Sequence, residues 1–210
     1  MIKYVVFDFD GTLVDSKAVF IQLYNAMAKR EGYTIMTPEN IEYLRTLSIS
    51  ERCSYLKMPL YKIPFVAAKF LKQYKASIHL LKFNEGVNAM LSELLGDKIP
   101  LAVLSSNSAK NIDTFFKQSG IGINDIYCSS NIFGKDKVLK KFLAQKKLKP
   151  SEILYIGDES RDIIACRKLG IEIAWVSWGY DSIEAISDCP PDHVIHSTDE
   201  LLKLIHQKTT

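Results

Sequence analysis

The segment that most constrains the fold is the apolar run Tyr4–Phe7, which stops abruptly at two carboxylates, Asp8 and Asp10, followed by Gly11. A short apolar run that ends at a turn residue is typical of a buried strand. Alternate residues of a strand point to the same side, so the two carboxylates can converge on one small site. In open α/β sheets ligands bind beyond the carboxyl ends of the strands, and this segment therefore predicts a functional site directly after the first strand.

Two carboxylates this close repel each other unless a proton or a cation lies between them. They either share a proton as general acid and base, or they lie beside a hard metal ion such as Mg2+. A pair of solvated acids that cap the next helix is the alternative for an isolated Asp-x-Asp. The Gly11-Thr12 pair and the motifs further along the chain favour the functional interpretation.

Strands and helices alternate through most of the chain, which predicts an α/β fold. Helical segments separate short apolar runs, and the pattern matches a Rossmann-like, doubly wound parallel sheet. The expected strands cover residues 4–7, 99–104, 125–128, 153–156, 172–176 and 193–195.

Residues 17–82 interrupt this alternation with a stretch that contains only helical patterns. We expect Ser50 to cap a short helix there and residues 62–77 to form a single longer one. An all-helical stretch directly after the first strand predicts an inserted helical cap. The expected division is a core of residues 1–16 and 83–210 and a cap of residues 17–82.

Polar groups follow three further segments of the predicted core. Because the carboxyl ends of parallel strands share one edge of the sheet, these groups and the first two acids can meet. The groups are Ser105 with Ser106 and Asn107, then Lys135, then Asp158 with Asp162.

These residue types suit phosphoryl transfer, which needs positioning, a metal ion and neutralisation of phosphate charge. Asp8 and Asp158 would hold Mg2+, because magnesium takes oxygen ligands from carboxylates. Lys135 would neutralise phosphate charge as a compact cation, and Ser105 with the following N–H groups would bind phosphoryl oxygens. A carboxylate can itself be the nucleophile and form an aspartyl-phosphate.

Each of these features has a simpler interpretation when it is taken alone. Ser105 to Ser108 is an ordinary helix cap, Lys135 is a solvated lysine with Lys137 as a competing candidate, and Asp162 complements a helix dipole. The ordered combination of all four features is far more specific than any one of them.

In these residues the chain resembles the haloacid dehalogenase superfamily of phosphatases. The first motif is Asp8-Phe-Asp-Gly-Thr-Leu-Val-Asp-Ser16, Ser105 or Ser106 matches the second, Lys135 the third and Gly157-Asp158 to Asp162 the fourth. The helical insertion resembles the type 1 cap of that family. The segments 176–180 and 191–201 look most like the phosphoglycolate-phosphatase-like branch.

The resemblance implies a role for each matched residue. Asp8 is expected to be the nucleophile and a Mg2+ ligand. Asp10 is expected to protonate the leaving alcohol, then to activate water, and to bind metal through its carbonyl. The fourth-motif acids Asp158 and Asp162 complete the expected metal site, whereas Glu159 stands where many relatives have a small residue. The expected substrate-binding residues are Gly11, Thr12, Ser105, Ser106 and Asn107.

The resemblance also bears on the kind of substrate. Relatives that cleave carbon–halogen bonds lack the second acid of the first motif, so Asp10 favours phosphate esters. Arg45 is the candidate cap residue, because a guanidinium can pair with an anionic leaving group. An exposed helix arginine is the alternative for that residue.

The predicted function is therefore Mg2+-dependent hydrolysis of a small phosphorylated metabolite. A phosphomutase of the β-phosphoglucomutase type uses the same motifs and is the alternative among enzymes. A binding or regulatory module that retains the fold without turnover is the alternative from another class. The intact Asp8, Asp10, Lys135 and Asp158 argue against such a module. A monomer and a homodimer are both compatible with the sequence.

Composition excludes other classes of function. A formal net charge of +3 over 210 residues, with no basic block interleaved with aromatics, gives no sign of nucleic-acid binding. No apolar run approaches the roughly 20 residues of a membrane helix. The four cysteines form no Cys-x-x-Cys pair, which favours reduced thiols in a cytoplasmic protein.

Overall fold

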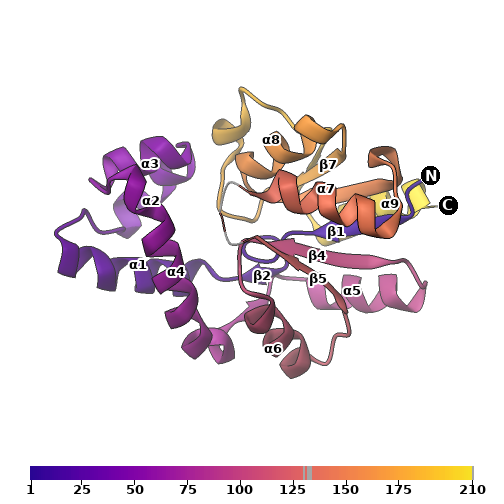
Figure 1. The fold of residues 1–210 in the computed structure, drawn as a ribbon, viewed down its shortest axis with the longest axis horizontal. Coiled ribbons are helices and arrows are strands. Elements are labelled where there is room, and N and C mark those ends of the chain that lie inside the picture. Colours follow the sequence, from indigo (N-terminus) through magenta and orange to yellow (C-terminus); the bar gives the residue numbers. More distant parts are fainter. Residues whose placement is uncertain (130, 132–133, 210) are drawn as a thin grey trace.

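A computed structural model describes residues 1–129, 131 and 134–209 of the chain. It contains a six-stranded parallel sheet with helices on both faces and a group of helices beyond one end of the sheet (Figure 1). This arrangement confirms the predicted α/β fold. The strands of the sheet are β1 (Tyr4–Phe7), β4 (Leu101–Ser105), β5 (Asp125–Cys128), β6 (Ile153–Gly157), β7 (Glu172–Val176) and β8 (His193–Ile195).

The strand order is β5-β4-β1-β6-β7-β8, which puts β1 at the centre between β4 and β6. Phe7, the last residue of β1, is in register with Val103 of β4 and with Ile156 of β6. The three central strands therefore end at nearly the same level. Whatever follows them in the sequence is brought together at one edge of the sheet.

Helices bury both faces of the sheet, and alternate side chains of each strand point to opposite faces. Val5 and Phe7 face a cluster that includes residues of α5 (Val87–Gly96), α6 (Ala109–Ser119) and α9 (Thr198–Thr209). Val6 faces the opposite cluster, which includes residues of α7 (Lys135–Lys146) and α8 (Ser160–Leu169). Figure 1 shows α7 and α8 above the sheet and α5 and α6 below it. Strands covered on both faces read as continuous apolar runs, and this explains why their positions were predictable.

Four helices occupy the chain between two short antiparallel strands, β2 (Val14–Asp15) and β3 (Lys82–Phe83). They are α1 (Lys17–Glu31), α2 (Pro38–Arg45), α3 (Ile49–Tyr55) and α4 (Ile63–Tyr74), drawn at the left of Figure 1. They pack on their own small cluster, which contains Tyr24, Met27, Ala28, Leu44 and Leu56. We call these four helices and their connections the cap. The division of the chain into two domains at residues 16 and 83 stays a prediction.

Two helix boundaries differ from those expected. The short third helix is capped by Ser48, not Ser50, because the Ser48 hydroxyl accepts a hydrogen bond from the Glu51 N–H and the Glu51 carboxylate accepts one from the Ser48 N–H. The helix expected over residues 62–77 ends at Tyr74 and continues as a 3₁₀ helix, Lys75–Leu80. Within the described ranges, every helix is too short or too polar to cross a membrane.

Candidate active site

The carboxyl edge of the sheet gathers the acids that the sequence singled out. Asp8 follows β1 directly and Asp158 follows β6 directly, and both are essentially buried. Ser105 ends β4 beside them, and Lys135 begins α7. Parallel strands in register explain this gathering of residues that lie up to 150 positions apart in the sequence.

Lys135 lies between two buried carboxylates. Its Nζ donates to Asp8 Oδ2 at 2.6 Å and also contacts Asp162 Oδ1. Burial lowers the pKa of Lys135, but the charges of Asp162 and Asp8 outweigh it and hold that pKa above its ordinary value. Burial raises the pKa of Asp162 to about 6 despite the lysine. The lysine ammonium is therefore a fixed positive charge beside Asp8.

Asp10 is held by two donors from opposite sides. The Tyr74 hydroxyl, at the end of cap helix α4, donates to Asp10 Oδ1. The Asn107 Nδ2 donates to Asp10 Oδ2 at 2.9 Å. Burial raises the pKa of Asp10, while both donors favour its charged form and oppose that rise. Burial and the nearby Asp10 charge raise the pKa of Tyr74, so this hydroxyl stays protonated and remains a donor.

Asp158 packs against the turn that follows Asp10. Its Oδ1 accepts from the Thr12 hydroxyl at 2.7 Å, and its Oδ2 accepts from the Tyr180 N–H at 2.7 Å. Two glycines make this close approach feasible: a Cβ on Gly11, whose φ is +80°, would lie 2.2 Å from Asp158 Oδ2, and one on Gly179 would lie 2.1 Å from Asp158 Cβ. Burial raises the pKa of Asp158 well above its ordinary value.

Glu159 points into the site, which the sequence alone left open. It is 9% exposed, and its carboxylate accepts from Arg161 Nε at 2.7 Å. Burial acts to raise the pKa of Glu159, but the charges of Arg161 and Lys135 outweigh it and lower that pKa. Arg161 Nη1 also donates to the Ser106 hydroxyl at 2.9 Å. A hydrogen bond from this ion-paired arginine thus connects the fourth motif with the second.

The two candidate serines of the second motif have different surroundings. Ser105 is buried, and its hydroxyl accepts from the Asn107 N–H at 3.1 Å. Ser106 is half-buried and contacts Arg161. The following helix α6 is capped by Ser108, whose hydroxyl accepts from the Asn111 N–H. Capping, the simpler interpretation of this segment, therefore applies to Ser108, while Ser105, Ser106 and Asn107 face the site.

A cavity of about 460 Å³ joins this site to the cap. Asp8, Asp10, Ser105, Ser106 and Asn107 line one end of it, and helices α1 to α4 form the other walls. The cavity lining does not include Gly11, Thr12, Lys135, Asp158 and Asp162. These residues lie behind the lining and support the side chains that form it.

Arg45 also lines the cavity, but its guanidinium is held by protein groups. Its Nη1 pairs with Glu42 at 2.9 Å, and its Nε and Nη2 lie 3.4 Å from the carbonyl oxygens of Tyr180 and Gly179. Its own carbonyl accepts from the Ser182 N–H at 3.1 Å. In this structure Arg45 links the cap to the core, and its contact with a leaving group stays a prediction.

The donor set at the sheet edge fits a hard divalent cation. Carboxylate oxygens of Asp8, Glu159 and Asp162 lie within 4.8 Å of one another. Oxygen ligands are those that Mg2+ prefers. Four acids are buried here beside two cations, Lys135 and Arg161, so the fully ionised site carries two surplus negative charges, the charge that one Mg2+ would balance. The four acids are Asp8, Asp158, Glu159 and Asp162.

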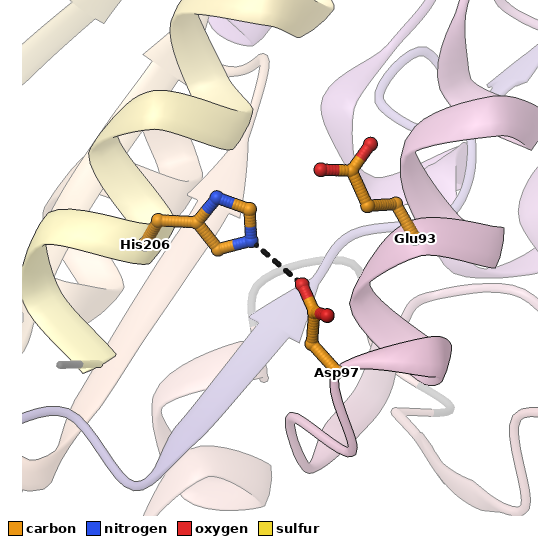
Figure 2. A group of neighbouring side chains, drawn as sticks. All are labelled: Glu93, Asp97 and His206. Carbon is orange, nitrogen blue, oxygen red and sulfur yellow. Dashed lines mark hydrogen bonds and ion pairs between the residues drawn. The ribbon is translucent and has the colours of Figure 1, made fainter.

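A second group with metal-ligand side chains, Glu93, Asp97 and His206, lies elsewhere (Figure 2). It connects the end of α5 with the end of α9, and His206 Nε2 lies 3.0 Å from Asp97 Oδ2. Asp97 lies four residues before the start of β4 at Leu101, so this group is at the amino end of the sheet, opposite the cavity. Glu93 and Asp97 are exposed, and the observed contact is a hydrogen bond at the surface.

Sequence reasoning missed two residues of the site. No sequence pattern identified Tyr74 as a site residue, because a tyrosine at the end of an apolar helix is normally interpreted as a core residue. Arg161 had a weak signal: it stands between Glu159 and Asp162 directly after a strand, where a cation beside buried acids is expected.

Comparison with known families places the chain among hydrolases. The family model for haloacid dehalogenase-like hydrolases matches residues 5–176, which include every acid discussed above. The chain is 27% identical over 205 residues to a phosphoglycolate phosphatase of Synechococcus elongatus, with 97% of each protein covered. It is also 27% identical to an (S)-2-haloacid dehalogenase of a Pseudomonas species, with 98% of the chain and 96% of the relative covered.

Solved structures agree on the fold. A haloacid dehalogenase-like family hydrolase from Streptococcus pneumoniae superimposes with a TM-score of 0.80 at 23% identity. The alignment covers 97% of this chain and 98% of that one. The similarity therefore extends through both the sheet and the cap.

Proposed function

The chain belongs to the haloacid dehalogenase-like hydrolase family and is a phosphatase, and from this premise we propose that it hydrolyses small phosphate monoesters with Mg2+. We propose further that the reaction passes through an aspartyl-phosphate on Asp8. The observation that carries the proposal is that Asp8 and Asp10 line the same cavity, with Lys135 fixed 2.6 Å from Asp8. A nucleophile and an acid at one cavity wall are what hydrolysis in two steps needs.

In the first step a carboxylate oxygen of Asp8 attacks phosphorus, and the bond from phosphorus to the alcohol oxygen breaks. Asp10 donates its proton to that oxygen. Burial favours the protonated form of Asp10, which suits this role. Tyr74 and Asn107 fix the carboxyl group from two sides, so the acid is oriented before the substrate arrives.

In the second step Asp10, now a carboxylate, takes a proton from water, and the water oxygen attacks phosphorus. The acyl phosphate bond to Asp8 breaks, and inorganic phosphate leaves. Lys135 offsets the negative charge of Asp8 in both steps. Ser105, Ser106 and the N–H groups after β4 are the proposed donors to phosphoryl oxygens.

Mg2+ would be held by Asp8, by Asp158 and by the carbonyl of Asp10, with Asp162 in support. Bound there, it would neutralise phosphate and carboxylate charge. The two surplus negative charges of the fully ionised site support this assignment. In the structure, Thr12 and Tyr180 hold the Asp158 carboxylate in place beside the turn that contains Asp10.

The presence of Asp10 supports phosphate esters over haloacids, although one relative is named as a dehalogenase. Several relatives are named phosphoglycolate phosphatase, so phosphoglycolate is the reference ester for an assay.

The experiment measures phosphate release from a panel of small monoesters with and without Mg2+. Wild type is compared with Asp8→Asn and with Asp113→Asn, an aspartate on the outer side of α6. We expect metal-dependent release, a loss on the order of a thousandfold or more in Asp8→Asn, and normal rates in Asp113→Asn. An isomeric sugar phosphate without free phosphate would indicate a mutase, and no turnover by folded protein would indicate a binding module.

A further inference from the structure

The cavity beside the active site has an unusual wall for an enzyme acting on a small charged ester. Its catalytic end is polar, but cap helices α1 to α4 surround the rest with apolar side chains. Phe20, Ile21, Ile41, Ile49 and Val66 line it, and each of them is only half-buried. Apolar surface that a protein leaves accessible in a concave site beside reactive groups is typical of a ligand-binding wall.

The three isoleucines among these side chains are not part of the packed core. Among the residues that the structure describes, Ile21, Ile41 and Ile49 lie outside the hydrophobic clusters of core and cap. They come from three different cap helices, α1, α2 and α3, and face one cavity. Burying them would be favourable by roughly 25 cal/mol per Å² of apolar area. This arrangement is therefore suited to binding an apolar group of a ligand.

Three of the four cations that line the cavity from the cap are already engaged by protein groups, and the fourth, Lys69 of α4, is exposed. Arg45 pairs with Glu42, and Arg52 pairs with the buried Asp181. Lys17 donates to the carbonyl oxygen of Trp178 at 2.9 Å. A leaving group such as glycolate that paired with any of these three cations would have to displace a protein group from it.

From these observations we propose that the cavity binds the apolar alcohol part of the substrate, so that the preferred esters are monoesters of aliphatic alcohols rather than phosphoglycolate. This inference rests on the proposed phosphatase activity. It is based on a single continuous cavity, which contains Asp8 and Asp10 at one end and extends between the apolar faces of the cap helices. The phosphate occupies the polar end, and the alkyl group follows the leaving oxygen toward Ile21, Ile41 and Ile49.

The volume of the cavity agrees with a leaving group larger than two carbons. At about 460 Å³ it lies within the roughly 300–1,000 Å³ of sites that enclose a drug-sized ligand. Phosphoglycolate would leave the apolar walls in contact with water. Each methylene that enters the cavity should raise kcat/KM about fourfold, the ratio that corresponds to about 0.8 kcal/mol.

The test is a series of monoesters with an uncharged alcohol part, ethyl, butyl and hexyl phosphate, with phosphoglycolate as reference and Mg2+ in every assay. We expect kcat/KM to rise by roughly fifteenfold from ethyl to butyl phosphate, which adds two methylenes, and to exceed the value for phosphoglycolate. Ile49→Asn should lower kcat/KM for butyl phosphate about tenfold more than it lowers kcat/KM for phosphoglycolate. Ile183→Asn is the matched control, because Ile183 is 50% exposed and lies outside the cavity.

The failures of the two proposals are distinguishable. Hydrolysis of phosphoglycolate with a flat alkyl series would overturn the inference and leave the phosphatase proposal standing. Absence of hydrolysis of every ester by folded protein would overturn both. A rising series that Ile49→Asn and Ile41→Asn leave unaltered would also contradict the assignment of this wall. If either variant fails to fold, the wild-type series decides the matter alone.

Discussion

Lys135→Met removes the charge that lies between two buried acids. The methionine has a similar length, so the helix that carries it keeps its packing while Asp8 and Asp162 lose their common partner. Removing one partner of a buried ion pair costs about 3–5 kcal/mol, because the remaining charge is uncompensated. For a chain of 210 residues, 1 kcal/mol corresponds to about 2–4 °C in Tm, so we expect a decrease on the order of 10 °C.

The size of this loss should depend on pH. Burial already raises the pKa of Asp162 to about 6, and loss of the lysine raises it further. An acid whose folded-state pKa lies above its unfolded value is destabilising when charged, and protonation relieves that cost. The deficit of Lys135→Met should therefore be complete above the raised pKa and become smaller as pH falls toward the unfolded value, near 4.

The assay is thermal unfolding in metal-free buffer at pH 8 and pH 5.5, for wild type, Lys135→Met and Lys137→Met. Lys137 is on the same helix and exposed, so its removal should leave Tm within about 1 °C. A Tm of Lys135→Met equal to that of wild type at pH 8 would refute the buried ion pair. A deficit of the same size at both pH values would refute the explanation through Asp162.

Two further changes test the positioning of the acids. Tyr74→Phe removes the hydroxyl that donates to Asp10, and we expect kcat to fall by roughly tenfold, the effect of one hydrogen bond to a charged group, with a near-native Tm in the same preparation. Gly179→Ala places a Cβ 2.1 Å from that of Asp158, and we expect it to lower the free energy of unfolding in urea by about 2 kcal/mol or more. Gly96→Ala is the control: its Cβ would have no neighbour within 4 Å, so the free energy of unfolding should not fall.

The centre of the sheet was predictable because β1, β4, β6 and β7 are largely apolar runs covered on both faces. Tyr4–Phe7 was located correctly for that reason, and the acids that follow it had to lie at the sheet edge once the fold was known. The end of the helix at Tyr74 was not predictable. Its hydroxyl acts on Asp10 across 64 positions of sequence, and no local pattern distinguishes it from a core tyrosine.

The candidate site was predictable in its residues and only in part in its contacts. The sequence indicated Thr12 as a substrate ligand, but the structure shows its hydroxyl on Asp158. It left Glu159 open, and the structure shows that carboxylate paired with Arg161 inside the site. Such contacts depend on which neighbours tertiary packing supplies, whereas the motif spacing reports only that the residues meet.

The most direct test of the account is acid quenching of the reaction with a substrate labelled at its phosphorus, followed by counting of label on the denatured protein. The account predicts label on wild type, bound to Asp8 and released by hydroxylamine, and none on Asp8→Asn. Turnover of the ester by wild type with no label on the protein in the pre-steady state, or label that persists in Asp8→Asn, would contradict it.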